Sequence, residues 1–182
     1  METKIIIGGF GGQGILFLGS ILAYTGMIEN KQVTWFPSYG AEIRGGTANC
    51  TVIVSDELIG SPIVKNPDVL IVMSDASLNK FQSQLKKDGM LFVDSSLIKA
   101  PIPRTDIEVV SVPATEISSK NGNTKSANMV LLGAFITRSE IVKKASVFKA
   151  LERTISTGNS KSIDMNKKAI TEGMRFIENT KG

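Results

Sequence analysis

The sequence predicts an α/β fold of three layers, in which helices cover both faces of a mostly parallel sheet. In the first half of the chain, short apolar segments alternate with segments whose apolar residues recur at helical spacing. The strand-like segments are apolar throughout, as expected for strands covered on both faces. A glycine-rich turn also joins the first strand-like segment to the first helical one. Together these observations favour a layered α/β fold.

Six segments are predicted to be strands, because each is apolar and bounded by glycine, proline or other turn-forming residues. They are residues 4–7, 32–36, 51–54, 69–73, 90–93 and 109–112. Pro37 is expected to end the second strand, since proline has no N–H group to donate to a sheet. Right-handed crossovers are expected between the parallel strands.

Helices are predicted where apolar residues recur three, four, seven or eight positions apart. These segments are residues 15–26, 78–85, 128–136, 147–155 and 163–177, the last two forming C-terminal helices at about 146–179. Ser77 is a candidate N-cap of the second helix. No repeat, low-complexity tract or linker divides the chain, so we expect a single domain over residues 1–182.

The composition excludes several kinds of chemistry. The 182 residues include no histidine and one cysteine. A Ser-His-Asp or Cys-His arrangement within the chain is therefore impossible. One thiol cannot supply the ligands of a zinc site or of an iron–sulfur cluster. Cys50 alone cannot form an internal disulfide, which fits a reducing compartment.

Charge and hydropathy exclude two further classes. The net charge is only +4, and the lysines are spread along the chain rather than clustered with aromatic residues, so we expect no nucleic-acid binding. The longest apolar stretch falls far short of the roughly 20 residues that span a bilayer. The N-terminus runs directly into a strand-like segment without the pattern of a signal peptide. We therefore expect a cytoplasmic protein that does not insert into a membrane.

The glycine-rich turn contains the pattern G-x-G-x-x-G as Gly9, Gly11 and Gly14, between a strand and a helix. This is the context of a dinucleotide-binding fingerprint. The second strand, however, ends without the acidic residue that binds the ribose, and no Walker lysine follows the glycines. The turn is thus expected either to pack the strand closely against the helix or to contact an anion or a partner, and NAD is disfavoured.

The loop at residues 37–47 is unusually rich in polar residues and glycine. If the second strand is parallel to the first, this loop meets the glycine turn at the edge of the sheet where ligands bind. Arg44 beside Gly45 and Gly46 is a fixed cation next to accessible backbone N–H groups, a combination suited to carboxylate or phosphate. Tyr39 and Glu42 could orient a polar group. The alternative is an exposed loop with a Glu42–Arg44 ion pair.

Other candidate residues carry less weight. Cys50 is expected to be a small buried hydrophobe, since no base accompanies it. Asp75 and Asp94 follow strands, so they either face the ligand-binding edge or form caps and turns. Asn128 begins a buried helix, which it either caps or orients toward the same edge. The methionines are expected to fill the core rather than bind a metal.

Five segments together resemble a known family. They are residues 9–14 (GFGGQG), 37–50 (PSYGAEIRGGTANC), 60–64 (GSPIV), 67–71 (PDVLI) and 127–134 (ANMVLLGA). They resemble the gamma subunit of 2-oxoacid:ferredoxin oxidoreductases, over about residues 4–137. The SPIV segment is most similar to the 2-oxoglutarate branch, 2-oxoglutarate synthase. The resemblance implies a Rossmann-like fold similar to the gamma domain of pyruvate:ferredoxin oxidoreductase.

The resemblance also implies a function and a set of partners. In that family the complex oxidatively decarboxylates a 2-oxoacid with coenzyme A, giving the acyl-CoA, carbon dioxide and reduced ferredoxin. Thiamine diphosphate is held by the large subunits, and iron–sulfur clusters lie in the beta and ferredoxin-like delta subunits. The gamma chain, which packs on the alpha, beta and delta subunits, is then expected to bind no cofactor alone and to be inactive alone. Separately, the isolated chain is expected to expose an apolar face meant for a partner, so we expect it to form a homodimer.

No catalytic residue and no metal ligand are expected in this chain. The expected cofactor-binding or partner-facing surface combines the glycine turn, the polar loop and the start of a buried helix. Its residues are Gly9, Gly11, Gly12, Gln13, Gly14, Ser38, Tyr39, Glu42, Arg44, Gly45, Gly46, Thr47 and Asn128. Arg44 is expected to hold an anionic group of the substrate, coenzyme A or a partner. Two alternatives remain: a Rossmann-like nucleotide-binding regulatory module, and a structural scaffold that touches no substrate.

Overall fold

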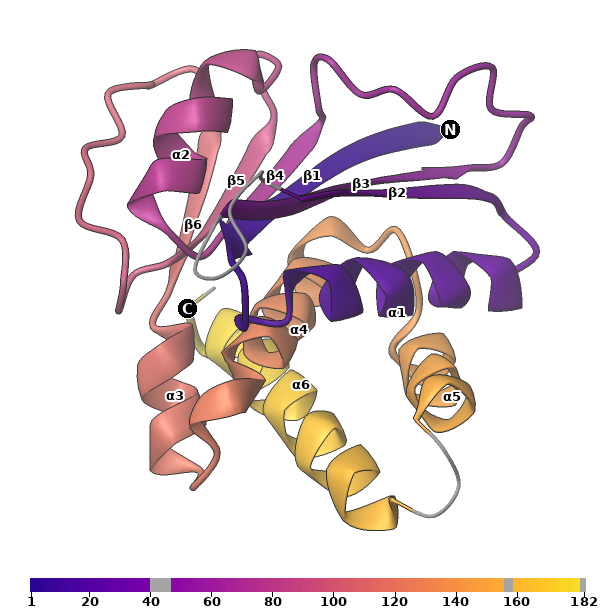
Figure 1. The fold of residues 1–182 in the computed structure, drawn as a ribbon, viewed down its shortest axis with the longest axis vertical. Helices are drawn as coiled ribbons and strands as arrows, with labels where there is room; N and C mark the ends of the chain where they lie inside the picture. The colour runs from indigo at the N-terminus through magenta and orange to yellow at the C-terminus, as the bar shows by residue number, and fades with distance from the viewer. Residues whose placement is uncertain (40–46, 156–158, 181–182) are drawn as a thin grey trace.

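The computed structural model describes residues 1–39, 47–155 and 159–180. A six-stranded sheet in the order β2-β3-β1-β4-β5-β6 has helices on both faces (Figure 1). The strands are β1 (Glu2–Phe10), β2 (Gln32–Tyr39), β3 (Thr47–Ser55), β4 (Val69–Val72), β5 (Met90–Asp94) and β6 (Glu108–Val112). The helices are α1 (Ile15–Ile28), α2 (Asp75–Phe81), α3 (Ala114–Lys120), α4 (Ala127–Ser139), α5 (Lys144–Thr154) and α6 (Ser160–Thr180), with the 3-10 helices η1 (Gln82–Gln84) and η2 (Thr124–Ser126).

The predicted three-layer α/β fold with a mostly parallel sheet is confirmed, with one reversal. The pairings β1–β4, β4–β5 and β5–β6 are parallel. β3 is antiparallel to both of its neighbours, β1 and β2. β2 therefore runs in the same direction as β1 but lies one strand away from it, at the edge of the sheet.

The prediction that Pro37 ends the second strand is wrong. β2 continues to Tyr39, and Pro37 stands in register with Cys50 of β3. β2 is an edge strand, where a residue without an N–H group can face away from the ladder at no cost in hydrogen bonds. β3 likewise begins earlier than predicted, at Thr47, because its first residues alternate between half-buried and buried positions instead of forming an apolar run.

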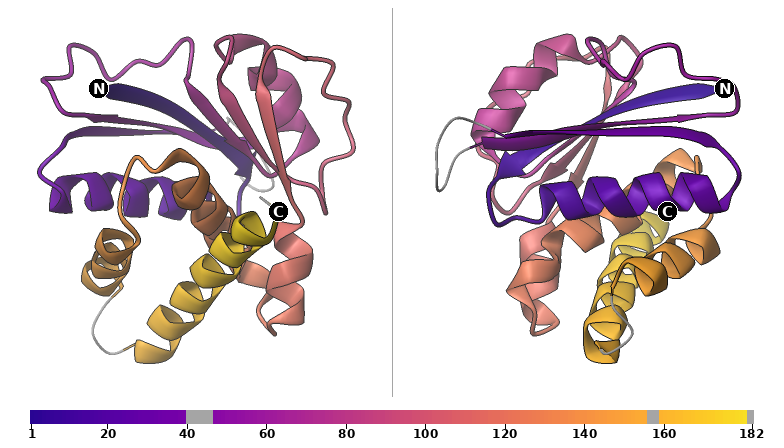
Figure 2. Two further views of the ribbon diagram at one scale, coloured as in Figure 1. Left: turned by 180° about the vertical axis from the view of Figure 1, so that it is seen from behind. Right: turned by 45° about the vertical axis from the view of Figure 1, so that its right-hand side comes forward.

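The sheet separates a large core from a smaller one. Ile5 and Ile7 of β1 belong to the large core beneath α1 and α4, whereas Ile6 belongs to the smaller core on the face that α2 covers. This alternation follows from successive strand residues pointing to opposite faces. Figure 2 shows α1, α4, α5 and α6 on one side of the sheet and α2 on the other.

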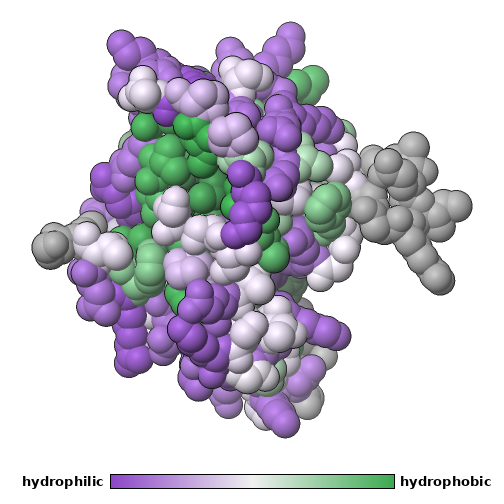
Figure 3. Space-filling view, turned by 90° about the vertical axis from the view of Figure 1, so that its left-hand side faces the viewer, coloured by the Kyte–Doolittle hydropathy of each residue, from purple (hydrophilic) through white to green (hydrophobic). Residues whose placement is uncertain are grey.

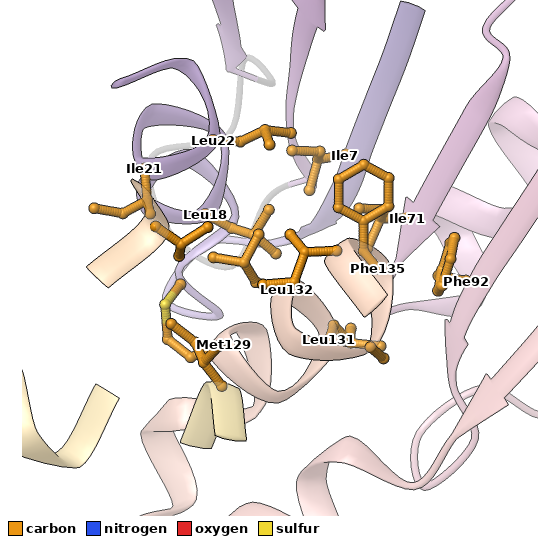
Figure 4. Close-up of a cluster of buried hydrophobic side chains, with 14 of the residues drawn as sticks. Ile7, Leu18, Ile21, Leu22, Ile71, Phe92, Met129, Leu131, Leu132 and Phe135 are labelled. Carbon is orange, nitrogen blue, oxygen red and sulfur yellow. The ribbon is translucent and has the colours of Figure 1, made fainter. Parts of the chain in front are cut away.

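The large core joins the sheet to α1 and α4, as the close-up in Figure 4 shows. Leu18 and Leu22 of α1 and Leu132 of α4 point toward Ile7 of β1. The ring of Phe135 meets that of Phe92 of β5 edge to face, with centroids 5.6 Å apart. Aromatic pairs of this geometry stabilise beyond the apolar area that they bury.

Two helix starts differ from the sequence prediction. Ser74, not Ser77, is the N-cap of α2: its hydroxyl accepts the N–H of Ser77 at 3.2 Å. α3 was not predicted, because its short sequence has no apolar stripe. Its start is held to β5 by Asp94, whose buried carboxylate accepts the hydroxyl of Thr115 at 2.5 Å.

Apolar side chains are exposed at both edges of the sheet. Trp35 and Phe36 are exposed on β2, and Val109 is exposed on β6. Figure 3 shows the side of the molecule on which β6 lies, where hydrophobic residues gather in one patch. Within the described parts of the chain, no helix has both the length and the apolar character needed to cross a membrane.

α4 and α6 cross at very short range because each contributes a glycine to the contact. A Cβ added at Gly133 of α4 would meet the carbonyl oxygen of Ile170, and one added at Gly173 of α6 would meet that of Val130. The obstacle in both cases is backbone, which cannot move aside as a flexible side chain could. The two glycines therefore set the distance between these helices.

Gly133→Ala is expected to lower the free energy of unfolding by about 2 kcal/mol, because overpacking outweighs the gain in helix propensity. Urea denaturation measures the change. Gly60→Ala is the matched control, since a Cβ there meets no atom within 4 Å. It should change stability by less than about 0.5 kcal/mol. Equal stability of the two variants would contradict the close crossing.

Candidate functional site

The glycine turn lies where β1 ends, and the strand register brings the ends of the polar loop beside it. Phe10 pairs with Thr47 of β3, and Gly9 pairs with Ala48. Ala48 pairs in turn with Tyr39, the last residue of β2. The two residues that flank segment 40–46 are therefore near the turn, although β3 lies between β1 and β2. Glu42, Arg44, Gly45 and Gly46 lie outside the described residues.

The turn has a backbone conformation that requires glycine. Gly12 and Gly14 have φ angles of 96° and 73°, in the left-handed region that other residues rarely adopt. Gly14 is the N-cap of α1, and its carbonyl accepts the N–H of Leu18 at 2.9 Å. The spacing of these two glycines thus reflects the geometry needed to reverse the chain between β1 and α1.

Gln13 fastens the turn to two strands. Its Oε1 accepts the N–H of Phe10 at 2.6 Å, and its Nε2 donates to the carbonyl of Met73 at 3.0 Å. Met73 directly follows β4. The side-chain amide therefore joins the ends of the neighbouring parallel strands β1 and β4, and both of its polar atoms are used within the chain.

Asn128 fastens the turn to α4. Its Nδ2 donates to the carbonyl of Gly14 at 3.0 Å, while its Oδ1 accepts the N–H of Met129 at 2.9 Å. The side chain is buried, and a Cβ at Gly14 would collide with it. Asn128 does not cap α4, whose N-cap is Ser126. Its amide instead contacts the glycine turn from within the protein.

The accessible part of the turn is narrower than the sequence suggested. Gln13 and Asn128 direct their amides inward, whereas Gly11 and Gly12 are exposed and Phe10 is 40% exposed. Ser38 is exposed near the end of β2, and Thr47 is half-buried. Phe10 was not singled out from the sequence, although an aromatic residue inside a run of glycines is a usable signal for an exposed contact.

The described residues at this turn lack the acidic residue of a Rossmann site. In a Rossmann site the strand beside β1 carries an acidic residue at its carboxyl end for the ribose. Here the strand beside β1 is β3, which runs the other way and places Thr47 and Ala48 at this edge. β2 ends one strand farther away, and its described residues include no acid. Among the residues that the structure describes, none therefore supplies the ribose contact that the pattern would need.

Cys50 is a core residue, as predicted. It is fully buried beside Trp35 and Gly19. Burial raises the pKa of its thiol to about 12. A thiol of this kind is neutral at physiological pH and is a poor nucleophile.

Asp75 and Asp94 act as turn and loop anchors rather than as free acids. Asp75 accepts the backbone N–H groups of Lys99 and Ala100, both at 2.8 Å. The N–H of Ala100, followed by that of Lys99, holds the pKa of Asp75 below its ordinary value. Asp94 accepts the N–H of Ser96 at 3.1 Å in the turn after β5. In the described part of the chain, no three His, Cys, Asp or Glu side chains are grouped to hold a metal ion.

Comparison with known proteins identifies the family. The model of the family described as "Pyruvate ferredoxin/flavodoxin oxidoreductase" matches residues 4–176. The chain belongs to this family. The 2-oxoglutarate synthase subunit KorC of Methanocaldococcus jannaschii is 35% identical over 161 residues, which are 87% of this chain and 86% of that protein.

Some relatives in the oxidoreductase family are much longer. Ketoisovalerate oxidoreductase subunit VorA of Methanothermobacter thermautotrophicus is 35% identical over 182 residues, which are 100% of this chain and 38% of that protein. The chain thus spans well under half the length of the VorA relatives.

Solved structures of the family share the fold. The gamma subunit of a keto/oxoacid ferredoxin oxidoreductase from Geobacter sulfurreducens has a TM-score of 0.84 at 28% identity, covering 96% of this chain and 95% of that one. The 2-oxoglutarate:ferredoxin oxidoreductase from Magnetococcus marinus has a TM-score of 0.89 at 20% identity and covers 98% of this chain and 31% of that one. At 20% identity, the match to the Magnetococcus marinus protein shows only that the two chains share a fold.

Asn128→Ala is expected to lower the free energy of unfolding by about 1–2 kcal/mol, because it removes the buried hydrogen bond to the Gly14 carbonyl and the Oδ1 acceptor of the Met129 N–H. Urea denaturation measures the loss. Asn79→Ala, at an exposed position of α2, is the matched control and should be nearly neutral. If both variants unfold at the same denaturant concentration, the Asn128 bond does not stabilise the turn.

Cys50 should resist thiol reagents in the folded protein, because burial keeps the thiol neutral and covered. Labelling with an aromatic disulfide near neutral pH is expected to occur only at the rate of unfolding. Ser38→Cys provides an exposed thiol on the same chain and should label at once. Immediate labelling of Cys50 in the wild type would show that the thiol is accessible.

Proposed function

We propose that the chain is the gamma subunit of a cytoplasmic complex that oxidatively decarboxylates a 2-oxoacid with coenzyme A, giving the acyl-CoA, carbon dioxide and reduced ferredoxin. Residues 1–182 form a single gamma-type domain in this proposal. The observation that carries it is the match over nearly the whole of both chains to a gamma subunit of Geobacter sulfurreducens. KorC relatives of similar length agree with it.

The preferred substrate is 2-oxoglutarate. Two KorC proteins are covered over 98–100% of their lengths by alignments at 31% identity. Ketoisovalerate is the second candidate, because VorA of Methanothermobacter thermautotrophicus is 35% identical, the same identity as KorC of Methanocaldococcus jannaschii. The substrate pocket is proposed to lie mainly on other subunits, so this chain contributes to selectivity only indirectly.

The proposed division of labour follows from the side chains at the turn. The side-chain amides of Gln13 and Asn128 form hydrogen bonds within the chain. The chain therefore supplies shape and electrostatics, while thiamine diphosphate and the iron–sulfur clusters are proposed to belong to the alpha, beta and delta subunits. The proposed surface toward those subunits consists of the turn residues Phe10–Gly12, Ser38, Thr47 and the loop containing Arg44.

The exposed apolar residues at the sheet edges support the proposal of a partner. Trp35 and Phe36 on β2 would be covered in a complex, and the isolated chain is proposed to cover part of this surface by forming a homodimer. A pure scaffold remains the alternative role for the chain within the same complex. The two roles differ in whether Arg44 affects the reaction.

Affinity purification of the tagged chain from its host tests the proposed complex. Mass spectrometry should identify thiamine-binding and cluster-binding oxidoreductase subunits. The purified complex should reduce a viologen dye in the presence of coenzyme A and 2-oxoglutarate, with slower reduction on ketoisovalerate and pyruvate. Recovery of the chain without any oxidoreductase subunit would overturn the proposal, and faster turnover of ketoisovalerate would reassign the substrate.

Arg44→Ala in the co-expressed complex tests the role of the polar loop. Loss of a charge-assisted hydrogen bond should raise the KM for coenzyme A or for the 2-oxoacid by about 10-fold or more, or weaken assembly to a similar degree. Arg153→Ala, at an exposed position of α5, is the matched control. Unchanged assembly, turnover and coenzyme A affinity in Arg44→Ala would favour the scaffold role.

A further inference from the structure

The connection between β3 and β4 forms a second exposed surface, far along β1 from the glycine turn. At its beginning, the N–H of Asp56 donates to the carbonyl of Met1. At its end, the N–H of Asp68 donates to the carbonyl of Lys4. Both contacts are at the start of β1, whereas the turn follows its end. Figure 1 shows this connection passing above the N-terminus. It contains segment 60–64, a part of the family resemblance that the glycine-turn surface leaves unexplained.

A basic hollow of about 460 Å³ lies against this connection. Its lining combines lysines from three parts of the chain with polar groups and one apolar side chain. The described residues that line it are Lys4, Ser61, Ile63, Lys65, Asn66 and Lys86. Lys4 and Lys86 each pair with one carboxylate just outside this lining, and Lys65 makes no ion pair with a described residue. The three lysines therefore keep an excess of positive charge at the hollow, which favours an anionic occupant.

The lysines are available to such an occupant. Lys65 is exposed and makes no ion pair with any residue that the structure describes. Lys86 pairs with Asp68 at 2.6 Å, and its side chain is 46% exposed. Lys4 pairs with Glu2 at 3.1 Å. Exposed pairs of this kind contribute little to stability, so their ammonium groups can exchange to an incoming carboxylate.

An apolar side chain stands among the cations. Ile63 is 69% exposed, and Leu58 in the same connection is 88% exposed. The hydroxyl of Ser61 accepts the N–H of Ile63 at 3.2 Å, which holds the local turn that presents Ile63. A small inorganic anion would leave Ile63 in water, whereas a protein surface would cover it. The mixture of lysines and an exposed isoleucine therefore favours a protein with carboxylates around an apolar side chain.

We propose that this basic hollow is the docking site for an acidic segment of a partner subunit. Carboxylates of that segment pair with Lys65, Lys86 and Lys4, and an apolar side chain packs on Ile63. The inference rests on the proposed function, since it takes the chain to be one subunit of a complex. It adds a contact at the opposite end of β1 from the glycine turn, so that the subunit is held at two separate places.

Lys65→Glu tests the docking site, because Lys65 supports no described ion pair and its replacement should leave the fold intact. Lys149→Glu on α5 changes the net charge equally at an exposed position on the other side of the sheet and is the matched control. Biolayer interferometry of each variant against the remaining subunits should show at least about tenfold weaker binding for Lys65→Glu at about 50 mM salt. The difference from Lys149→Glu should shrink at about 500 mM salt, where charges are screened.

Zero-length carbodiimide cross-linking of the wild-type complex provides an independent measurement. Mass spectrometry should find Lys65 or Lys86 joined to an aspartate or glutamate of one partner subunit. Equal binding of Lys65→Glu and Lys149→Glu, with neither lysine cross-linked to a partner, overturns the docking site while leaving the complex established. Binding of tripolyphosphate that is lost in Lys65→Glu, with assembly unchanged, overturns it in favour of a small-anion site. Absence of any co-purifying oxidoreductase subunit overturns the proposed function and, with it, this site.

Discussion

The position of every layer depends on β1, which is the one strand that the structure pairs with an antiparallel neighbour on one side and a parallel neighbour on the other. Its isoleucines fill both cores: Ile5 and Ile7 lie beneath α1 and α4, and Ile6 lies beneath α2. Because both faces and both edges of β1 are occupied, only its two ends remain for function. The glycine turn lies at one end and the basic hollow at the other.

At the glycine turn, polar side chains serve the architecture before they serve any ligand. The Gln13 amide joins β1 to β4, and the Asn128 amide joins the turn to α4. A fixed turn presents the same surface to every partner, which suits a subunit that contributes shape rather than reacting groups. Within the pattern G-x-G-x-x-G, Gly14 serves chain reversal and Gly9 serves close packing. The reversed β3 explains why a similar pattern need not bring nucleotide binding with it.

The sequence predicted the elements well where one signal dominated. Apolar runs located β4 and β5, and the helical stripe of Ile163, Ile170 and Ile177 located α6. The direction of β3 could not be predicted, because the sequence of a single strand does not show which strands it pairs with or in which direction it runs beside them. The extent of β2 past Pro37 depended on its place at the edge, which is a tertiary property. The sequence offers two serines near the start of α2, and the prediction chose Ser77. The N-cap is Ser74, whose hydroxyl accepts the N–H of Ser77.

The candidate site divides in the same way. Sequence spacing found Gly9 and Gly14: Gly14 has a positive φ angle, and a Cβ at Gly9 would collide with the side chain of Gln13. The positive φ angle of Gly12 lies outside the pattern. The sequence also singled out Gln13 and Asn128. The inward direction of their side chains depends on the folded chain, which brings Met73 close to Gln13 and Gly14 close to Asn128, and sequence spacing alone does not show this. The basic hollow had no sequence signature, because its lysines come from separate segments of the chain.

The hydrogen bond between Asn128 and Gly14 also bears on how the protein folds. These residues are 114 positions apart, so the bond closes a long loop, and the entropy of closing that loop disfavours its early formation. The pairing of β2 with β3 spans residues close in sequence and can form early. The turn then acquires its final shape only when α4 docks. The proposed surface toward partner subunits is therefore complete only once α4 has packed into the large core.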